Sequence, residues 1–294
     1  MPVPAPYGAG MTHRPKRLAV LGQPISHSRS PAIHTAALAE LGLAGEWSYE
    51  AIEVAPEDFD ERVRAMPGEE FVGANVTVPH KLAALAIADD ASEAARAIGA
   101  ANTLTFADGR IAADNTDATG LLDALPDSPS GTRALVLGAG GSARAVVWAL
   151  VDAGADVSIW NRTPEKAEAL AGELGASALQ AVDVGDFGLL VNATTVGMGA
   201  STQVSSDLKS LPVAADALDE RHQLVDLAYG AVETELVRAA RARGARVVDG
   251  LEVLVRQGAA SLRIWTGLDP PIEVMRRAVR EDTWQAKTHP DTDT

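Results

Sequence analysis

Residues 134–144 read ALVLGAGGSAR: an apolar run typical of a β-strand, then the spacing G-x-G-x-x-A, then an Ala-rich helical stretch that continues to Ala153. Gly138 permits a tight turn, Gly140 lets the backbone approach a pyrophosphate, and Ala143 lets the helix pack close to the sheet. A Gly-rich turn without a ligand is the alternative, because the glycine pattern alone is a weak signal. Its position between a strand and a helix favours a dinucleotide-binding turn.

The next predicted strand, 156–160, ends at Asn161-Arg162-Thr163, about 20 residues after the glycines, where enzymes that use NAD place an acidic residue against the ribose 2′-hydroxyl. This chain has the guanidinium of Arg162 there, with Lys166 one turn later, and both suit a 2′-phosphate. The sequence therefore predicts NADP rather than NAD. The alternative is a helix start with Thr163 as its N-cap and a solvated Arg162, and both can hold.

Short β-branched runs alternate with Ala-rich helical stretches along most of the chain, which predicts an α/β fold with a largely parallel sheet. The segment PDSPSGT at 126–132 places a domain junction near residue 120. The chain crosses back near residue 250, where a long amphipathic helix begins, with Gly267 as its C-cap. We expect strands at 18–22, 47–52, 71–78, 103–106, 134–138, 156–160, 189–193, 224–227 and 246–249, a hairpin turn at Asp108-Gly109, and flexible tails at 1–14 and 286–294.

Charge and composition exclude several classes of partner. The net charge is −15 over 294 residues, without a block of Lys or Arg, so attraction to nucleic acid or to an anionic membrane is not expected. No apolar run approaches the roughly 20 residues that span a bilayer. Residues 1–10 lack the order of a signal peptide, and a cytoplasmic location is therefore predicted. The chain has no Cys, which excludes disulfides, thiolate metal sites and cysteine nucleophiles, and no metal site is expected.

A polar stretch follows the third predicted strand. In FVGANVTVPHK at 71–81, apolar side chains alternate with Asn75 and Thr77, so one face of the strand carries hydrogen-bonding groups. Pro79 predicts a helix start that places Lys81 in the first turn. An amine at that place suits a group that exchanges protons with a substrate. A solvated lysine is the more ordinary alternative.

Asp117 and the pair Ser28 and Ser30 also have two interpretations. Asp117 precedes a predicted helix and either caps it, which contributes about 1 kcal/mol, or faces a site. Ser30 has the spacing of an N-cap before Pro31 at the first helical position. Ser28 has no such duty, and its hydroxyl can point into a cleft with that of Ser30.

Together these segments resemble the shikimate dehydrogenase family from near residue 17 to near residue 280. Any single block can arise by chance, whereas the ordered series is specific. The blocks are GQPISHSRSPAIH at 22–34, GANVTVPHK at 73–81, AANTL at 100–104, DNTDATG at 114–120, GAGGSARA at 138–145, NRT at 161–163, NATTVGM at 192–198, DLAY at 226–229 and DGLEVLVRQ at 249–257.

The resemblance implies a two-domain α/β enzyme with its active site in the cleft between the domains. The implied substrate-binding domain covers residues 15–118 and is completed by helices at 251–285, and a Rossmann-like NADP-binding domain covers 119–250. The implied reaction is the reversible, NADPH-dependent reduction of 3-dehydroshikimate to shikimate, within aromatic amino-acid biosynthesis. A homodimer is left open.

The resemblance also assigns roles to residues. The implied catalytic pair is Lys81 and Asp117. The implied substrate contacts are Ser28, Ser30, Asn75, Thr77, Asn102, Tyr229 and Gln257, although Gln257 would by its sequence alone be an exposed polar residue. The implied cofactor contacts are Gly138, Ala139, Gly140, Gly141, Ser142, Ala143, Arg144, Asn161, Arg162, Thr163 and Lys166, with Gly250 near the nicotinamide.

Two other functions fit the same scaffold. An enzyme that acts on quinate with NAD is disfavoured because Arg162 occupies the position where enzymes that use NAD have an acidic residue. A non-catalytic NADP-binding or regulatory protein would need neither Lys81 nor Asp117, and this chain has both.

Overall fold

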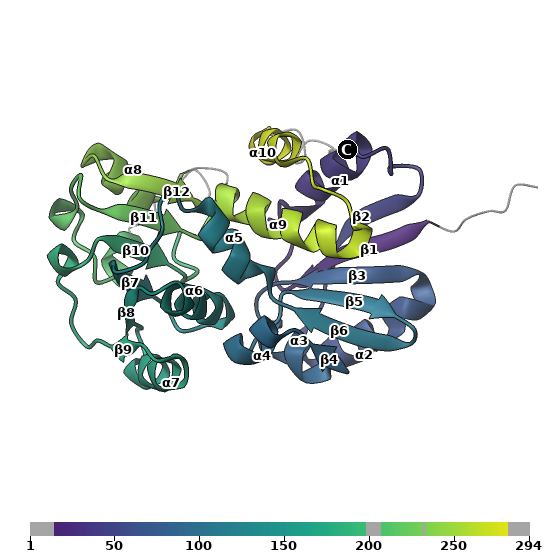
Figure 1. Cartoon of the computed structure of the whole chain (residues 1–294), viewed down its shortest axis with the longest axis horizontal. Helices are drawn as coiled ribbons and strands as arrows, with labels where there is room; N and C mark the ends of the chain where they lie inside the picture. Colours follow the sequence, from purple (N-terminus) through teal and green to yellow (C-terminus); the bar gives the residue numbers. More distant parts are fainter. Residues whose placement is uncertain (1–14, 198–206, 231–232, 282–294) are drawn as a thin grey trace, which may run out of the picture.

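The structure, a computed structural model, describes residues 15–197, 207–230 and 233–281. This described part forms two lobes, each built on a six-stranded sheet with helices packed against it (Figure 1). The α/β class predicted from the alternating pattern is therefore confirmed. The tails predicted at 1–14 and 286–294 lie outside the described residues.

The first sheet is of mixed direction. Its strands are β1 (Lys16–Gly22), β2 (Trp47–Glu53), β3 (Phe71–Val76), β4 (Asp90–Ala91), β5 (Thr103–Ala107) and β6 (Arg110–Asp114), in the order β2-β1-β3-β5-β6-β4. β1 runs parallel to β2 and β3, and β5 runs antiparallel to β3 and β6. The β5–β6 turn has positive φ angles at Asp108 (51°) and Gly109 (72°), which confirms the predicted hairpin turn.

The second sheet is parallel throughout. Its strands are β7 (Arg133–Leu137), β8 (Asp156–Trp160), β9 (Ser177–Ala178), β10 (Leu189–Asn192), β11 (Gln223–Asp226) and β12 (Arg246–Asp249), in the order β12-β11-β10-β7-β8-β9. All the strands predicted from the sequence are present, with ends that agree within two residues. The two-residue strands β4 and β9 were not predicted, because so short a strand has no periodic signal.

Helices connect the strands and cover the sheets. They are α1 (Ser30–Glu40), α2 (Phe59–Ala65), α3 (Lys81–Ile87), α4 (Glu93–Ile98), α5 (Thr116–Ala124), α6 (Gly141–Asp152), α7 (Pro164–Leu174), α8 (Glu235–Ala242), α9 (Gly250–Thr266) and α10 (Ile272–Arg280). Short 3-10 turns lie at Pro56–Asp58, Met66–Glu69, Val184–Asp186, Asp207–Ser210 and Ala215–Ala217. Among the described residues, none of the helices is both long enough and apolar enough to cross a membrane.

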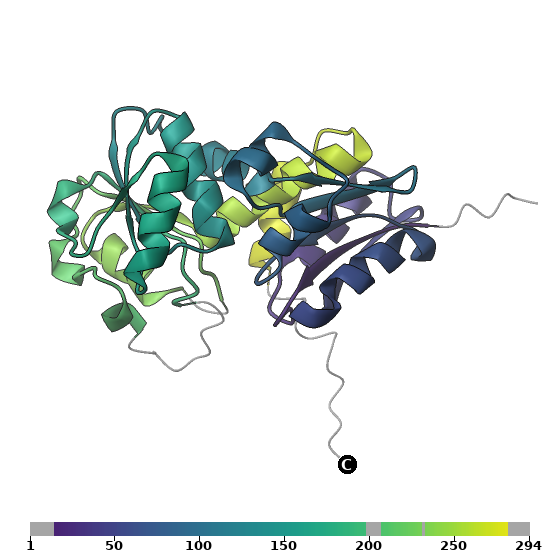
Figure 2. The ribbon, with the colours of Figure 1, turned by 90° about the horizontal axis from the view of Figure 1, so that it is seen from below.

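The last helices return to the first lobe. α9 starts at the end of β12, capped by the Asp249 side chain, which accepts from Glu252 N at 3.0 Å, and it ends at Gly267 with φ +70°. Val255 and Leu262 of α9 and Met275 of α10 are buried in the core that contains β1 and α1. Figures 1 and 2 show α9 running between the two lobes and onto the first. The chain thus crosses back where the sequence predicted it.

Candidate active site

Lys81 lies where the first lobe meets the second. β3 ends at Val76, and a turn closed by the bond from His80 N to Thr77 O (2.9 Å) leads into α3, of which Lys81 is the first residue. The lysine is only 8% exposed. Its Nζ donates to Asp117 Oδ2 at 2.7 Å and to Ser142 Oγ at 2.9 Å. The alternative of a solvated lysine is therefore wrong.

Asp117 is free to bind Lys81 because another residue caps its helix. The N-cap of α5 is Asn115, whose side-chain oxygen accepts from Asp117 N at 3.1 Å. The interpretation of Asp117 as the cap is therefore wrong. Its Oδ2 accepts from Lys81, and its Oδ1 accepts from Asn102 Nδ2 at 2.9 Å. Both carboxylate oxygens are thus held in place, one by a cation and one by an amide.

Asn102 joins Asp117 to the C-terminal helix. Its Nδ2 also donates to Gln257 Oε1 at 3.1 Å, and its Oδ1 accepts from Thr116 N at 2.7 Å. Gln257 is buried rather than exposed, since α9 packs directly on α5. A Cβ at Gly120 would lie 2.6 Å from Gln257 Cβ, so only glycine allows the two helices this close. These amides form one wall of the candidate site.

Asn75 is the centre of a second buried cluster. Its Nδ2 donates to Ser261 Oγ at 2.9 Å, and its Oδ1 accepts from the Tyr49 hydroxyl at 2.7 Å. Ser261 Oγ lies 3.1 Å from both Thr103 Oγ1 and Thr116 Oγ1. The cluster therefore connects β2, β3, β5 and α5 with α9, and each amide or hydroxyl in it has a polar partner, as buried polar groups require.

Ser28 and Ser30 do not divide their roles as predicted. α1 begins at Ser30 itself, with Arg29 at the cap position in a helical conformation (φ −91°, ψ 0°), so Ser30 is not the N-cap. The hydroxyl of Ser28, predicted to have no capping duty, instead accepts from Ser30 N at 3.3 Å. An N-cap residue normally has extended backbone angles, and the residue before α1, Arg29, has helical ones.

Two tyrosine hydroxyls lie beside these serines. Burial raises the pKa of Tyr49 well above its usual value, although a hydrogen bond with the Ser30 side chain opposes this. Burial also raises the pKa of Tyr229, against hydrogen bonds with the Arg29 backbone and the Ser28 side chain. Both phenols therefore stay neutral, and Tyr49 uses its proton to donate to Asn75 Oδ1 at 2.7 Å. The hydroxyls of Ser28, Ser30 and Tyr229 form a cluster suited to an anionic group.

The glycine loop, residues 138–144, reaches the same place from the second lobe. Gly138 has φ +112°, which side chains rarely allow. Gly140 is in the N-cap position of α6, and a Cβ there would have open space around it. A Cβ at Gly141 would lie 3.0 Å from Lys81 Cβ. The loop thus has room for a ligand on one side and contacts Lys81 on the other, and the first N–H groups of α6 have no acceptor within the helix.

The segment after β8 presents cations to solvent. Arg162, Thr163 and Lys166 are exposed, and Arg162 forms no ion pair with any other residue of the described part. Asn161 Nδ2 donates to Thr163 O at 2.9 Å. Thr163 takes the N-cap position of α7, as predicted, although its hydroxyl makes no capping hydrogen bond. Exposed cations at the end of a strand next to the glycine loop fit a 2′-phosphate.

Gly250, the first residue of α9, lies against the end of β11. A Cβ there would lie 2.8 Å from Leu227 O and 2.9 Å from Asp226 O. No side chain larger than hydrogen fits this contact without a shift of the backbone. The glycine therefore allows the start of α9 to lie directly beside the carboxyl end of the second sheet.

Arg144 has protein partners from both lobes. Its Nε donates to Ile98 O at 2.6 Å, at the carboxyl end of α4, and its Nη2 pairs with Glu173 Oε2 at 2.5 Å on α7. A cation near the carboxyl end of a helix is favourable. The guanidinium predicted to contact the cofactor is thus also a link between the lobes.

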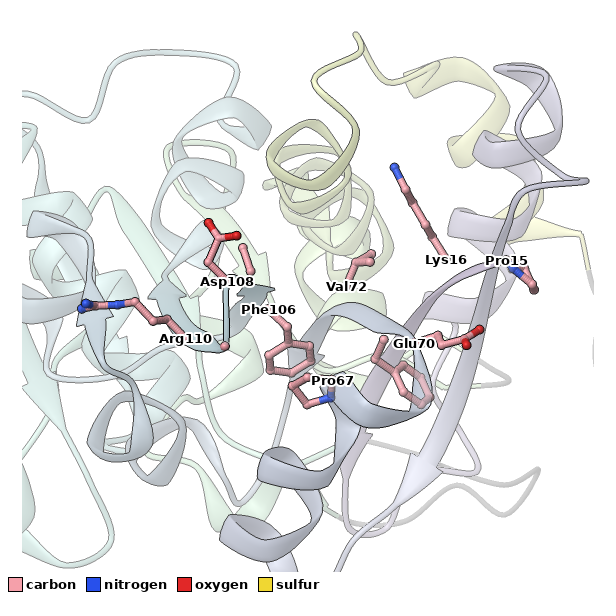
Figure 3. A pocket seen from close by; sticks show the side chains of 11 residues that line it. Pro15, Lys16, Pro67, Glu70, Val72, Phe106, Asp108 and Arg110 are labelled. Carbon is pink, nitrogen blue, oxygen red and sulfur yellow. The ribbon is translucent and has the colours of Figure 1, made fainter. Parts of the chain in front are cut away.

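A separate pocket lies at the other end of the first sheet (Figure 3). It has a volume of 540 Å³ and is lined by the amino ends of β1 and β3 and by the β5–β6 turn, with Lys16, Glu70, Phe106 and Arg110 around it. Lys81 and Asp117 are not among its lining residues. The pocket is therefore distinct from the candidate active site.

Three family descriptions match successive parts of the chain. Residues 20–104 match the shikimate dehydrogenase substrate binding domain, residues 122–248 match shikimate / quinate 5-dehydrogenase, and residues 250–280 match the shikimate 5′-dehydrogenase C-terminal domain. The chain belongs to the shikimate dehydrogenase family. The resemblance seen in the ordered sequence blocks is thereby confirmed, as is NADP(H) as the cofactor.

Individual relatives agree with this assignment. A shikimate dehydrogenase (NADP(+)) of Thermus thermophilus is 44% identical over 90% of this chain and 97% of its own length. The crystal structure of a Thermus thermophilus shikimate 5-dehydrogenase in complex with NADP(H) and shikimate has 44% identity and a TM-score of 0.81, covering 90% of this chain and 98% of that one. A ligand-free 5-ketofructose reductase of Gluconobacter is also similar, with 30% identity and a TM-score of 0.79 over 91% of this chain and 98% of that one.

Sequence reasoning for this shikimate dehydrogenase family member missed Tyr49, Thr103, Thr116 and Ser261. Only one of them had a usable signal. Ser261 follows Gln257 by four residues on α9, and its Oγ donates to Gln257 O at 3.0 Å, so the two share a helix face. A polar pair on the buried face of an amphipathic helix is the pattern that could have identified it.

Proposed function

We propose that this protein interconverts 3-dehydroshikimate and shikimate with NADP(H), using Lys81 and Asp117 as its catalytic pair. The observation that carries the proposal is the contact of 2.7 Å between Lys81 Nζ and Asp117 Oδ2, largely shielded from solvent at the junction of the lobes and next to the glycine loop. Ion pairs shielded from solvent are weak evidence for a stabilising role, and titratable groups gathered beside a ligand-binding loop are candidates for proton transfer.

The residues of the second lobe fit a phosphorylated dinucleotide. The pyrophosphate would lie against the loop Gly138, Ala139, Gly140, Gly141, Ser142, Ala143 and Arg144, where a helix N-terminus offers free N–H groups. Arg162 and Lys166 would hold the 2′-phosphate, and Asn161 and Thr163, on either side of Arg162, would shape the turn. Gly250 would lie near the nicotinamide. When bound, the cofactor supplies or accepts the hydride at the carbonyl carbon.

Lys81 moves the proton in this proposal. As an ammonium it stabilises the negative charge that develops on the carbonyl oxygen and then delivers a proton from Nζ to that oxygen. Asp117 directs the amine, because its Oδ2 accepts from Nζ while Asn102 holds its Oδ1. In the reverse direction the lysine takes the proton from the substrate hydroxyl. Proton delivery by a positioned group contributes about 10² to 10⁴ in rate.

The first lobe would bind the substrate. Ser28 and Ser30, with the neutral phenol of Tyr229, would donate to the carboxylate. Thr77, at the end of β3, and Gln257 would contact ring hydroxyls. Asn75 and Asn102 would line the same site, and their amides also bond to Tyr49 and Asp117.

A mixture of purified protein, shikimate and NADP tests this proposal. The nicotinamide absorbance should rise, and 3-dehydroshikimate with NADPH should reverse it. Quinate with NAD is the competing pair, disfavoured because Arg162 stands where NAD enzymes have a carboxylate. Faster turnover of quinate with NAD than of shikimate with NADP, or faster reduction of 5-ketofructose than of 3-dehydroshikimate with NADPH, would overturn the proposed substrate. The cytoplasmic location and a homodimer stay predictions, which cell fractionation and analytical sedimentation check.

A further inference from the structure

Ser142 belongs to the glycine loop, and its side chain also contacts the catalytic lysine. We propose that its hydroxyl is a positioning group that orients the Lys81 ammonium for proton delivery, an inference that rests on the proposed function. The loop would thus serve the chemistry as well as the cofactor phosphates.

The geometry at the amine carries this inference. An ammonium group has three N–H donors in fixed directions around the nitrogen. Asp117 Oδ2 at 2.7 Å takes one, and Ser142 Oγ at 2.9 Å takes another. With two donors occupied, the third N–H has a single direction left, in which the substrate oxygen would lie. Without the Ser142 hydroxyl the ammonium could rotate about its Cε–Nζ bond, and the side chain could rotate about its other single bonds.

The stem of the lysine is held by the same loop. A Cβ at Gly141 would lie 3.0 Å from Lys81 Cβ and 3.3 Å from Lys81 Cδ, so the backbone of Gly141 already lies against the side chain. Gly141 and Ser142 are the first two residues of α6. The second lobe therefore fixes both the stem and the tip of a lysine that belongs to the first lobe, and this limits the rotation of a long and otherwise flexible side chain.

The hydroxyl and the backbone of Ser142 have separate duties in this proposal. As the second residue of α6, Ser142 has a backbone N–H with no acceptor inside the helix, and this group can bind a phosphate oxygen. The side-chain oxygen is bonded to Lys81. The alternative is that the side chain, too, serves only the phosphate. The two roles predict opposite effects on kcat and on cofactor affinity.

Three variants separate these roles: Ser142→Ala, Ser142→Thr, and Ser177→Ala, an exposed serine on β9 of the same lobe, as control. Loss of one typical hydrogen bond should lower kcat of Ser142→Ala about 3- to 10-fold and raise its solvent deuterium isotope effect. The dissociation constant of NADPH, from fluorescence, should not change. Ser142→Thr, which keeps the hydroxyl, should restore kcat, and Ser177→Ala should match the wild type.

Two results would overturn the positioning role. One is a Ser142→Ala variant with wild-type kcat and wild-type NADPH affinity, in which the hydroxyl has neither role. The other is a variant with wild-type kcat and weaker NADPH binding, which would assign the hydroxyl to the phosphate. Neither result would affect the proposed function, because the wild-type protein would still turn over shikimate. Absence of turnover in the wild type would instead remove the proposed function and this inference with it.

Discussion

In the first lobe the polar side chains of the candidate site are buried and bonded to one another, whereas the second lobe offers glycines and exposed cations. Asn75, Asn102 and Gln257 are each less than 10% exposed and linked through Ser261 and its neighbours. Arg162 and Lys166 project into solvent. One lobe thus has a rigid arrangement before any ligand binds, and the other has open space with positive charge around it.

This difference separates two kinds of effect. Substitutions in the buried network should change the chemical step, since they move groups that need accurate placement. Substitutions among the exposed cations should change cofactor affinity and leave the chemistry intact, because these groups contact a part of the cofactor remote from the nicotinamide.

Lys81→Ala should have the largest effect. It removes the proton-transfer group of the first lobe, so kcat should fall by about 10² to 10⁴. NADPH should still bind with wild-type affinity by fluorescence titration, because the glycine loop and Arg162 are unchanged. Lys16→Ala, an exposed lysine at the other end of the same sheet, is the matched control. A turnover number within a factor of about two of the wild type, which no lost proton donor would allow, would remove the catalytic role.

Asp117→Asn should have a smaller effect on the same step. The amide keeps the shape and a hydrogen bond but loses the charge that holds Lys81. A charge-assisted bond contributes about 1.5 to 3 kcal/mol, so kcat should fall about 10- to 100-fold in steady-state assays. Asp123→Asn, exposed on the same helix, should leave kcat unchanged. If the variant lost only affinity for NADPH, Asp117 would serve cofactor binding and not the chemical step.

Arg162→Ala tests the second lobe. Removal of the guanidinium should raise the KM for NADPH about tenfold or more and leave the KM for NADH and both kcat values almost unchanged. Steady-state kinetics with both cofactors, beside Arg110→Ala of the first lobe as control, measures this. Equal increases for NADPH and NADH would mean that Arg162 does not contact the 2′-phosphate.

The smallest effect concerns pH and stability at the C-terminal helices. Hydrogen bonds with Arg276 hold the pKa of Glu252 at about 2, with burial opposing and Arg256 adding to the effect. Since this lies below the unfolded value of about 4.3, the stabilisation is present above that pH and is lost as the pH falls toward 2.

The stability of Glu252→Gln therefore checks the sign of this effect. The variant should be less stable than the wild type at pH 7 by about 1 kcal/mol or less, because solvent screens the pair. Urea denaturation should show the difference shrinking from about pH 4 downward. Glu281→Gln, exposed after α10, should change stability at neither pH. A difference that grew as the pH fell would contradict the ion-pair account.

The fold, the cofactor-binding segments and the place of Lys81 could be predicted because their sequence signals are local. A strand, a glycine turn and a helix follow one another within residues 133–152, and the cations after β8 come from one short segment. The place of Lys81 also follows from neighbouring residues, since α3 starts where the sequence predicted a helix start.

The buried network was not predictable in the same way. Asn75 and Ser261 are 186 residues apart, and Asn102 and Gln257 are 155 apart, so only the packing of α9 brings them together. Capping was misassigned for a related reason. Asn115, Asp117, Ser28 and Ser30 all have side chains able to cap, and the choice among neighbours depends on backbone angles that tertiary packing sets.

A crystal structure of the protein with NADP and shikimate bound would show whether Lys81 is the proton-transfer group. We expect Lys81 Nζ within about 3 Å of the substrate hydroxyl that is oxidised and still bonded to Asp117, with the nicotinamide on the other side of the carbon. A reacting hydroxyl that faces another titratable group, with Lys81 directed away from it, would rule out this role.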